Sequence, residues 1–167
     1  SASYLPSSEA VSVKSSTAYA VSYTPEMVEG LTVGFASQDD ESGSASTTTD
    51  DSSESTMYAK YTYGSVTVGY QESELDSDTD TEDADSSGFG ISYAVSDSLS
   101  IAYAEHTYET TGNTNAATGA DQESSAISAS YTMGGMTIAG VMNEVDNVAG
   151  VAATDKEAYE LNLSFAF

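Results

Sequence analysis

The densest group of chemically active side chains is the acidic run 76–85, which begins with carboxylates alternating with hydroxyls. The acids at alternate positions from its start are Asp76, Asp78, Asp80 and Glu82. This spacing begins like a calcium-binding loop, but an EF-hand loop also needs glycine at its sixth position and glutamate at its twelfth. The chain has Thr81 and Ser87 at those positions, so the EF-hand match fails. The sequence favours a solvated loop, with weak Ca²⁺ or Mg²⁺ binding as the functional alternative and no other cofactor.

The other candidates for chemistry are single residues. Lys60, His106 and Glu160 are titratable side chains that lie within segments of alternating apolar and polar residues. His106 is the only histidine, and the spacing identifies no hydroxyl–histidine–acid arrangement. The chain contains no cysteine, which excludes disulfide scaffolds and thiolate metal sites. We therefore expect no enzymatic activity.

The charge balance excludes a further class of partner. The chain has 27 acidic residues and three basic ones, so its formal net charge is −24. A nucleic-acid-binding protein needs many basic side chains to neutralise phosphates, so nucleic acid is not expected as a partner. High net charge is also typical of disorder, but 12 tyrosines and a hydrophobic content of 39% favour a folded chain.

The elements that must position these residues are strands, because apolar residues recur at every second position. The pattern predicts nine strands, at 17–24, 31–38, 56–63, 65–72, 87–95, 98–106, 125–133, 135–143 and 157–167. Short joints between them alternate strictly with long ones. The long joints are 39–55, 73–86, 107–124 and 144–156. The short joints are rich in Gly, Ser and Asp, as tight hairpin turns are, so the repeating unit is a hairpin with a long loop.

Alternation also sorts the strand residues onto two faces. One face is apolar and uncharged, with Val, Leu and Ile between tyrosines and phenylalanines that lie toward the strand ends. The other face is mostly Ala, Gly, Ser and Thr. The candidates for lining an aqueous interior on this second face are Lys60, Gln71, His106, Glu160 and Asn162.

Two architectures explain a strictly apolar face. In a soluble β-sandwich this face would meet the core, whereas in a membrane barrel it would meet lipid. The small, nearly uncharged polar face, the aromatic residues near strand ends and the alternating short and long joints all favour the barrel. No stretch approaches 18 apolar residues, so no transmembrane helix is expected.

The C-terminal segment 159–167 alternates to the last residue and ends on phenylalanine. Its apolar positions are Tyr159, Leu161, Leu163, Phe165 and Phe167. This segment resembles the terminal strand of Gram-negative outer-membrane proteins, which the β-barrel assembly machinery reads. With its hairpins and acidic loops, the chain over 17–167 resembles the C-terminal half of a general diffusion porin.

The resemblance implies an all-β, antiparallel transmembrane barrel of sixteen strands with short periplasmic turns and long acidic external loops. Residues 17–167 would supply about nine of these strands, and 1–16 would be an external loop or an N-terminal extension. It also implies the outer membrane of a Gram-negative bacterium, contact with lipid and lipopolysaccharide, and a homotrimer. Small hydrophilic solutes and ions would diffuse passively through the barrel. The many acids around the mouth predict a preference for cations.

Three alternatives remain open at this stage. The first is a secreted acidic β-sandwich that acts as an adhesin or surface module. The second is a small non-channel barrel of the outer membrane, and the third, least favoured, is a barrel that carries a hydrolase site. The N-terminal residues lack the pattern of a signal peptide. We therefore expect that such a segment has been removed or that the chain begins inside a longer protein.

Overall fold

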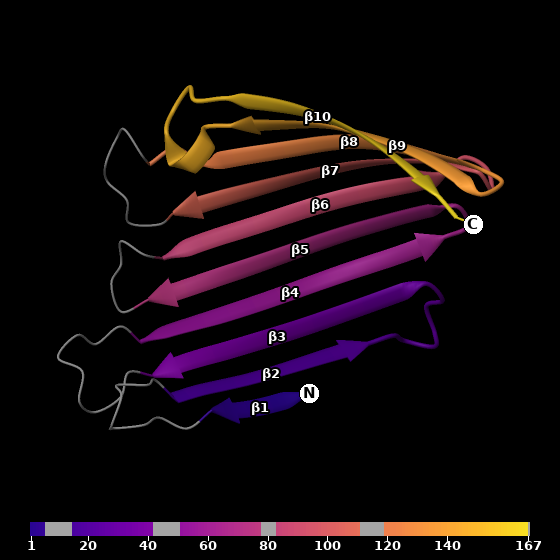
Figure 1. Ribbon diagram of the computed structural model, residues 1–167. Helices are drawn as coiled ribbons and strands as arrows, with labels where there is room; N and C mark the ends of the chain where they lie inside the picture. The colour runs from indigo at the N-terminus through magenta and orange to yellow at the C-terminus, as the bar shows by residue number, and fades with distance from the viewer. Residues whose placement is uncertain (6–14, 42–50, 78–82, 111–118, 167) are drawn as a thin grey trace.

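The computed structural model describes residues 1–5, 15–41, 51–77, 83–110 and 119–166. They form one antiparallel sheet in which ten strands follow one another in chain order, each paired with the next (Figure 1). The strands are β1 (Ala2–Leu5), β2 (Ser15–Tyr23), β3 (Leu31–Glu41), β4 (Ser52–Tyr63), β5 (Val66–Ser77), β6 (Ala84–Ala94), β7 (Leu99–Thr110), β8 (Gln122–Met133), β9 (Met136–Asp146) and β10 (Lys156–Phe165). A short 3₁₀ turn, η1 (Val148–Gly150), lies between β9 and β10.

The sheet has no hydrophobic core within the described residues. Ala84, with 5% of its surface exposed, is the one buried apolar residue among them. Large side chains of the apolar face are open instead; Leu161, for example, is 77% exposed. A β-sandwich would cover this face with a second sheet, whereas the described strands form a single sheet. The prediction of an all-β antiparallel sheet is confirmed, and the sandwich alternative is wrong.

The sheet is open in the part of the chain that is described. β1 and β10 lie at opposite ends of the strand order, and each is paired on one side only. None of the helices in these ranges is long and apolar enough to span a membrane.

Eight of the nine predicted strands are longer than the sequence predicted, always at the end away from the short turns, whereas β10 covers Lys156–Phe165 instead of 157–167. β5, for example, continues to Ser77 rather than ending at residue 72, and β8 begins at Gln122 rather than at 125. The apolar alternation stops earlier because these strand ends carry mostly acids and hydroxyls, with only isolated apolar residues such as Leu75 and Val145.

The described residues also hold one strand more than the nine that the sequence predicted. Residues 1–16 were expected to be a loop or an extension, but Ala2–Leu5 pairs with β2 as β1, and β2 starts at Ser15. Four residues are too few to show a clear period-two pattern, which is why the strand was missed. Residues 6–14 lie outside the described part.

Three of the four short joints contain a glycine in the left-handed region. Gly64 and Gly134 have φ of 57° and 59° in the two turns between β4 and β5 and between β8 and β9. At Gly30 (φ 87°) an added Cβ would lie 2.0 Å from the carbonyl oxygen of Thr62, so this turn also needs glycine for space. The sequence signal for tight turns at these joints is therefore confirmed.

Candidate pore wall

The polar face, defined by Lys60 and the residues that share its side of the sheet, contains a shallow hollow of about 400 Å³ over β4 to β7. The polar residues that line it on this face include Tyr58, Lys60, Gln71 and His106. The register explains why they meet: Gln71 pairs with Tyr58 on one side and with Gly88 on the other, and Gly88 pairs with His106. Lys60, Gln71 and His106, three of the five residues predicted to line the interior, therefore lie around the same hollow.

Glycines form the floor of this hollow. Lys60 pairs with Gly69, which pairs with Gly90, so no side chain fills the row beside the lysine. The His106 ring reaches over Gly88, where an added Cβ would lie 3.6 Å from its Cδ2 atom. Within the described ranges Lys60 makes no ion pair. Its ammonium group is therefore available to a solute or counter-ion.

The other two interior candidates lie on β10, away from this hollow. Asn162 donates a hydrogen bond to the carboxylate of Glu160 at 2.5 Å. Their paired residues on β9 are Ala139 and Val141, so they project from the same face as Lys60. The structure therefore brings Glu160 and Asn162 together, but not with Lys60, Gln71 and His106.

Hydroxyl pairs line the polar face near the short turns. Thr62 and Thr67 are hydrogen-bonded to each other at 3.0 Å, and Thr132 and Thr137 at 2.9 Å. Ser100 and Ser130 form a third pair across β7 and β8, also at 2.9 Å. Each pair holds hydroxyls directly opposite one another on neighbouring strands, which gives a wettable wall without net charge.

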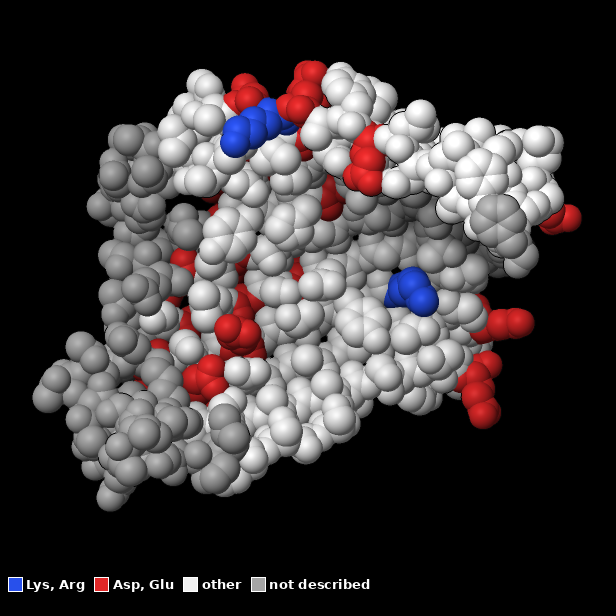
Figure 2. Space-filling model, viewed as in Figure 1, with Lys and Arg blue, Asp and Glu red and all other residues white. Residues whose placement is uncertain are grey.

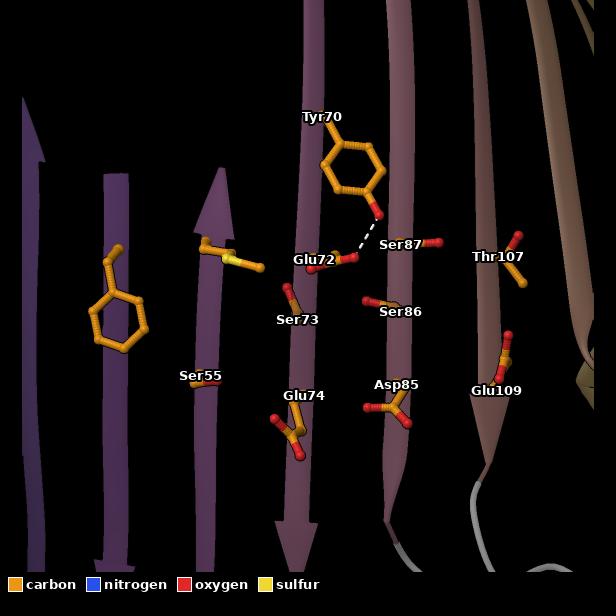
Figure 3. Close-up of a pocket in the computed structure, with 12 residues that line it drawn as sticks. Ser55, Tyr70, Glu72, Ser73, Glu74, Asp85, Ser86, Ser87, Thr107 and Glu109 are labelled. Atoms are coloured by element: carbon orange, nitrogen blue, oxygen red, sulfur yellow. Dashed lines mark hydrogen bonds between the residues drawn. The ribbon is translucent and has the colours of Figure 1, made fainter. Parts of the chain in front are cut away.

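On the apolar face, three tyrosines are followed by acidic residues toward the long loops. Tyr70 donates a hydrogen bond to Glu72 at 2.5 Å, as Figure 3 shows, and Tyr159 donates to Glu157 at 3.1 Å. Tyr103 donates in the same way to Glu105. In each case the carboxylate lies two residues from the tyrosine, on the same face and toward the long loops. The aromatic residues therefore mark a boundary between an apolar zone and an acidic zone.

Acidic side chains in this outer zone also face one another. Glu74 on β5 pairs with Asp85 on β6, which pairs with Glu109 on β7 (Figure 3). In the part of the chain that the structure describes, no group of three or more acidic or histidine side chains is arranged to hold a metal ion. Of the four candidates for weak Ca²⁺ or Mg²⁺ binding, Asp76 ends up on β5, and Asp78, Asp80 and Glu82 lie outside the described residues.

The distribution of charge differs from the sequence prediction that the strands are nearly uncharged. The longer strands include many acids, and these lie on the apolar face beyond the tyrosines. The acidic strand residues of the polar face are Asp40, Glu54 and Glu160. Both described lysines, Lys60 and Lys156, are on this face, and Figure 2 shows two separate blue patches, with several red ones, among mostly white side chains.

Two contributions to the polar face were missed from the sequence. Tyr58 lies on this face with its ring over Gly34, where an added Cβ would come within 2.2 Å of the ring. Its position between Met57 and Ala59 on the apolar face would have revealed it, because alternation puts it beside Lys60. The second contribution is Gln122, whose side chain binds the loop between β9 and β10. No sequence signal indicates that contact.

This sheet geometry matches that of a membrane barrel of known structure. The anion-selective porin from Comamonas acidovorans superposes on this chain with a TM-score of 0.69 at 14% sequence identity. The match covers 93% of this chain and 50% of that porin, so the chain spans about half the length of the matched protein. At this identity the likeness establishes the fold. No curated protein sequence matches the chain significantly.

A family model described as Gram-negative porin matches residues 1–147. The chain therefore belongs to the Gram-negative porin family, and its location is the outer membrane. The family description and the fold are both those of porins. The matched region includes the N-terminal residues that the sequence resemblance omitted, and it ends before the C-terminal segment 159–167 that carried the most specific part of that resemblance.

Proposed function

We propose that this chain forms part of the wall of a water-filled barrel through which small hydrophilic solutes and ions diffuse passively. The observation that carries the proposal is the contrast between the faces. One face exposes large apolar side chains, and the other is built from small residues and paired hydroxyls. The first suits lipid and the second suits water. The residues proposed to line the lumen are Lys60, Gln71, His106, Glu160 and Asn162, joined by Tyr58.

The test is reconstitution of the protein extracted from outer membranes. We expect stable, ion-conducting steps in planar bilayers and swelling of liposomes in solutions of small sugars. The protein should need detergent to stay dispersed, because the apolar face has no covering layer in the described residues. A protein that inserts into bilayers and conducts no ions would instead be a non-channel barrel.

The proposed preference for cations rests on the external rim. Asp40 and Glu54 lie on the polar face at the long-loop ends of β3 and β4, and the long loops add further acids. Lys60 opposes this field farther down the wall. The relative of known structure is described as anion-selective, so the sign of the reversal potential in a salt gradient is the decisive measurement. Clear anion selectivity at low salt would overturn the preference.

Closure of the barrel requires strands beyond those described. An unpaired strand edge exposes backbone N–H and C=O groups, which lipid cannot satisfy. The one-sided pairing of β1 and β10 supports a larger barrel, which we take to have sixteen strands, with this chain as its C-terminal half. The short turns would lie on the periplasmic side and the long loops outside. Protection of the β10 amides from hydrogen exchange in the assembled barrel would show that this edge is paired.

The assembly part of the proposal names four partners: lipid, neighbouring copies of the protein, the assembly machinery and lipopolysaccharide. The apolar face would contact lipid and, in a homotrimer, neighbouring copies. The β-barrel assembly machinery would read the apolar positions of 159–167, and lipopolysaccharide would surround the acidic zone, with Ca²⁺ or Mg²⁺ at the loop acids. Removal of the last residue, Phe167, should slow assembly and leave the unheated oligomer less abundant on gels. A protein that is monomeric in mild detergent would contradict the trimer.

A further inference from the structure

The loop between β9 and β10, residues 147–155, has an unusual composition for this chain. Every other long joint carries several acids or hydroxyls, whereas this loop has the uncharged apolar run 148–153. It is also ordered by hydrogen bonds along its length. Val148 donates its backbone N–H to the carbonyl oxygen of Thr154 at 2.7 Å, and Thr154 donates to that of Val151 at 3.2 Å.

Asn147 holds the base of this loop. Its side-chain amide donates to the carbonyl oxygen of Asp121 at 3.0 Å, and its side-chain oxygen accepts from the N–H of Ala153, also at 3.0 Å. Its own N–H donates to the carboxylate of Asp155 at 3.2 Å. One residue thus ties the two ends of the loop together and to the residue that precedes β8.

The loop also carries backbone strain. Asn147, Ala149 and Ala153 have φ of 53°, 57° and 59°, in the left-handed region that residues other than glycine seldom occupy. Such a conformation is unfavourable for alanine, whereas asparagine adopts it more readily. It persists only where surrounding contacts determine it, and these contacts fix the loop on one side of the sheet.

The side of the sheet is identified by Gln122. Its side-chain oxygen accepts the N–H of Ala149 at 2.8 Å, and the carbonyl oxygen of Gly150 accepts the N–H of Ala120 at 3.0 Å. Gln122 pairs with Tyr108 on β7, and Tyr108 lies two residues from His106 on that strand. The side chains of Gln122 and Tyr108 therefore project from the same polar face as that of His106. The amide that anchors the loop therefore comes from the face that would line the lumen.

We propose that the β9–β10 loop folds inward over the polar face and forms an uncharged lip that narrows the external mouth on the side of β8 to β10. This inference rests on the proposed channel function. Solutes would enter between this apolar lip and the acidic parts of the rim. The lip would then limit solute size without adding charge, while the acids act on ions.

A single-cysteine experiment tests the position of the lip, because the chain contains no cysteine of its own. Ala152→Cys places a thiol on the exposed apolar run, and a bulky methanethiosulfonate reagent added to the open channel should reduce its conductance. Met27→Cys is the matched control: Met27 is 96% exposed in the turn between β2 and β3, at the opposite rim, and its modification should leave the conductance unchanged.

The anchor is tested separately. Gln122→Leu removes the acceptor for the Ala149 N–H and should increase both the conductance and the size of the largest neutral polyethylene glycol that enters. Gln122→Glu keeps an acceptor oxygen and should retain the size limit. Asn147→Gly keeps a residue that tolerates positive φ but removes both side-chain hydrogen bonds, and it should behave like Gln122→Leu.

The outcomes separate the two proposals. Absence of any conductance in the unmodified protein would overturn the channel function itself. A conducting protein in which stoichiometric modification of Ala152→Cys, confirmed by mass, leaves the conductance unchanged would overturn the inward lip. The same conclusion would follow if Gln122→Leu and Asn147→Gly kept the polymer size limit of the unmodified channel.

Discussion

Position 34 requires glycine because the ring of Tyr58 occupies the space that a side chain would fill. The two residues are directly paired on β3 and β4, and an added Cβ would lie 2.2 Å from the ring. Gly69, on the same face of β5, has only a backbone oxygen 3.9 Å from the corresponding position. Gly34 and Gly69 are each the fourth residue of their strand, but they serve different purposes. Gly34 makes room for the Tyr58 ring, and Gly69 leaves the wall open beside Lys60.

We therefore expect Gly34→Ala to destabilise the barrel and Gly69→Ala to have little effect. Overpacking of this kind costs roughly 1–3 kcal/mol, because either the Tyr58 ring or the backbone must move. The measurement is the temperature at which the oligomer loses its fast mobility on unheated gels. Addition of Tyr58→Ala to Gly34→Ala should recover part of the loss. Equal effects of the two glycine substitutions would contradict the packing argument.

The row of paired acids on the outer zone gives a second residue-level prediction. Glu109 lies directly opposite Asp85, and like charges in directly opposed positions destabilise a sheet by roughly 0.2–1 kcal/mol. Glu109→Gln should therefore raise thermal stability at low ionic strength, and the gain should shrink as salt screens the repulsion. Glu105→Gln is the control on the same strand and face, because Glu105 is opposite Phe89 and Ser125. A similar gain at Glu105 would exclude the pairwise repulsion.

Lys60 allows a measurement of how strongly one wall charge acts on permeating ions. A unit charge acts across ~10 Å of water with about 0.4 kcal/mol, which changes an ion's local concentration roughly twofold. Lys60→Gln should therefore raise the cation-to-anion permeability ratio by up to about fourfold, because cations and anions respond in opposite senses, as measured by the reversal potential. Lys156→Gln, at the start of β10, is the comparison near the mouth. A ratio that is unchanged or falls would place Lys60 outside the ion path.

At the scale of elements, each strand has two zones with different partners. The zone near the short turns alternates apolar with mostly small polar residues, and the zone near the long loops is rich in acids and hydroxyls with few apolar residues. The sequence predicted the first zone well, because lipid contact imposes apolar side chains at every second position. It ended the strands too early, since the second zone meets water on both faces and is held by backbone pairing, which no hydropathy pattern reports.

The same reasoning explains what else could not be predicted. β1 pairs through four residues, which gives too short a pattern for its period to be recognised. The inward position of 147–155 depends on a contact with Gln122, a residue 27 positions from Ala149 in the chain. By contrast, the shared face of Lys60, Gln71 and His106 follows from alternation alone. Their common hollow follows from register, which the short turns determine.

The two faces of β10 give a direct test of which side meets lipid. Leu161 is 77% exposed on the apolar face, and its neighbour Asn162 projects from the opposite face. Arginine on the lipid face at the midplane of a barrel costs about 2–4 kcal/mol. Leu161→Arg should therefore reduce the folded fraction in lipid bilayers under urea, whereas Asn162→Arg should fold normally and alter conductance. The reverse pattern would mean that the faces have been assigned to the wrong sides.

At the scale of the whole molecule, the net charge of −24 describes the outer surface more than the channel. Except for Asp40, Glu54 and Glu160, the acidic residues within the strands lie on the apolar face beyond the tyrosines. Charges on that side are separated from the lumen by the thickness of the sheet, which is comparable with the Debye length of about 10 Å at 0.1 M salt. They should contribute little to the field that permeating ions experience.

Ion selectivity should therefore respond to the few acids of the polar face and ignore the many acids of the outer zone. The combined substitution Asp40→Asn and Glu54→Gln should lower the cation-to-anion permeability ratio measured at 0.1 M salt. Replacement of Glu72, Glu105 and Glu144 by Gln removes one charge more, but from the opposite face, and it should leave the ratio unchanged. If instead the ratio followed net charge in both variants, the acids would act as one diffuse field around the mouth. The separation of charge by face would then have no consequence for transport.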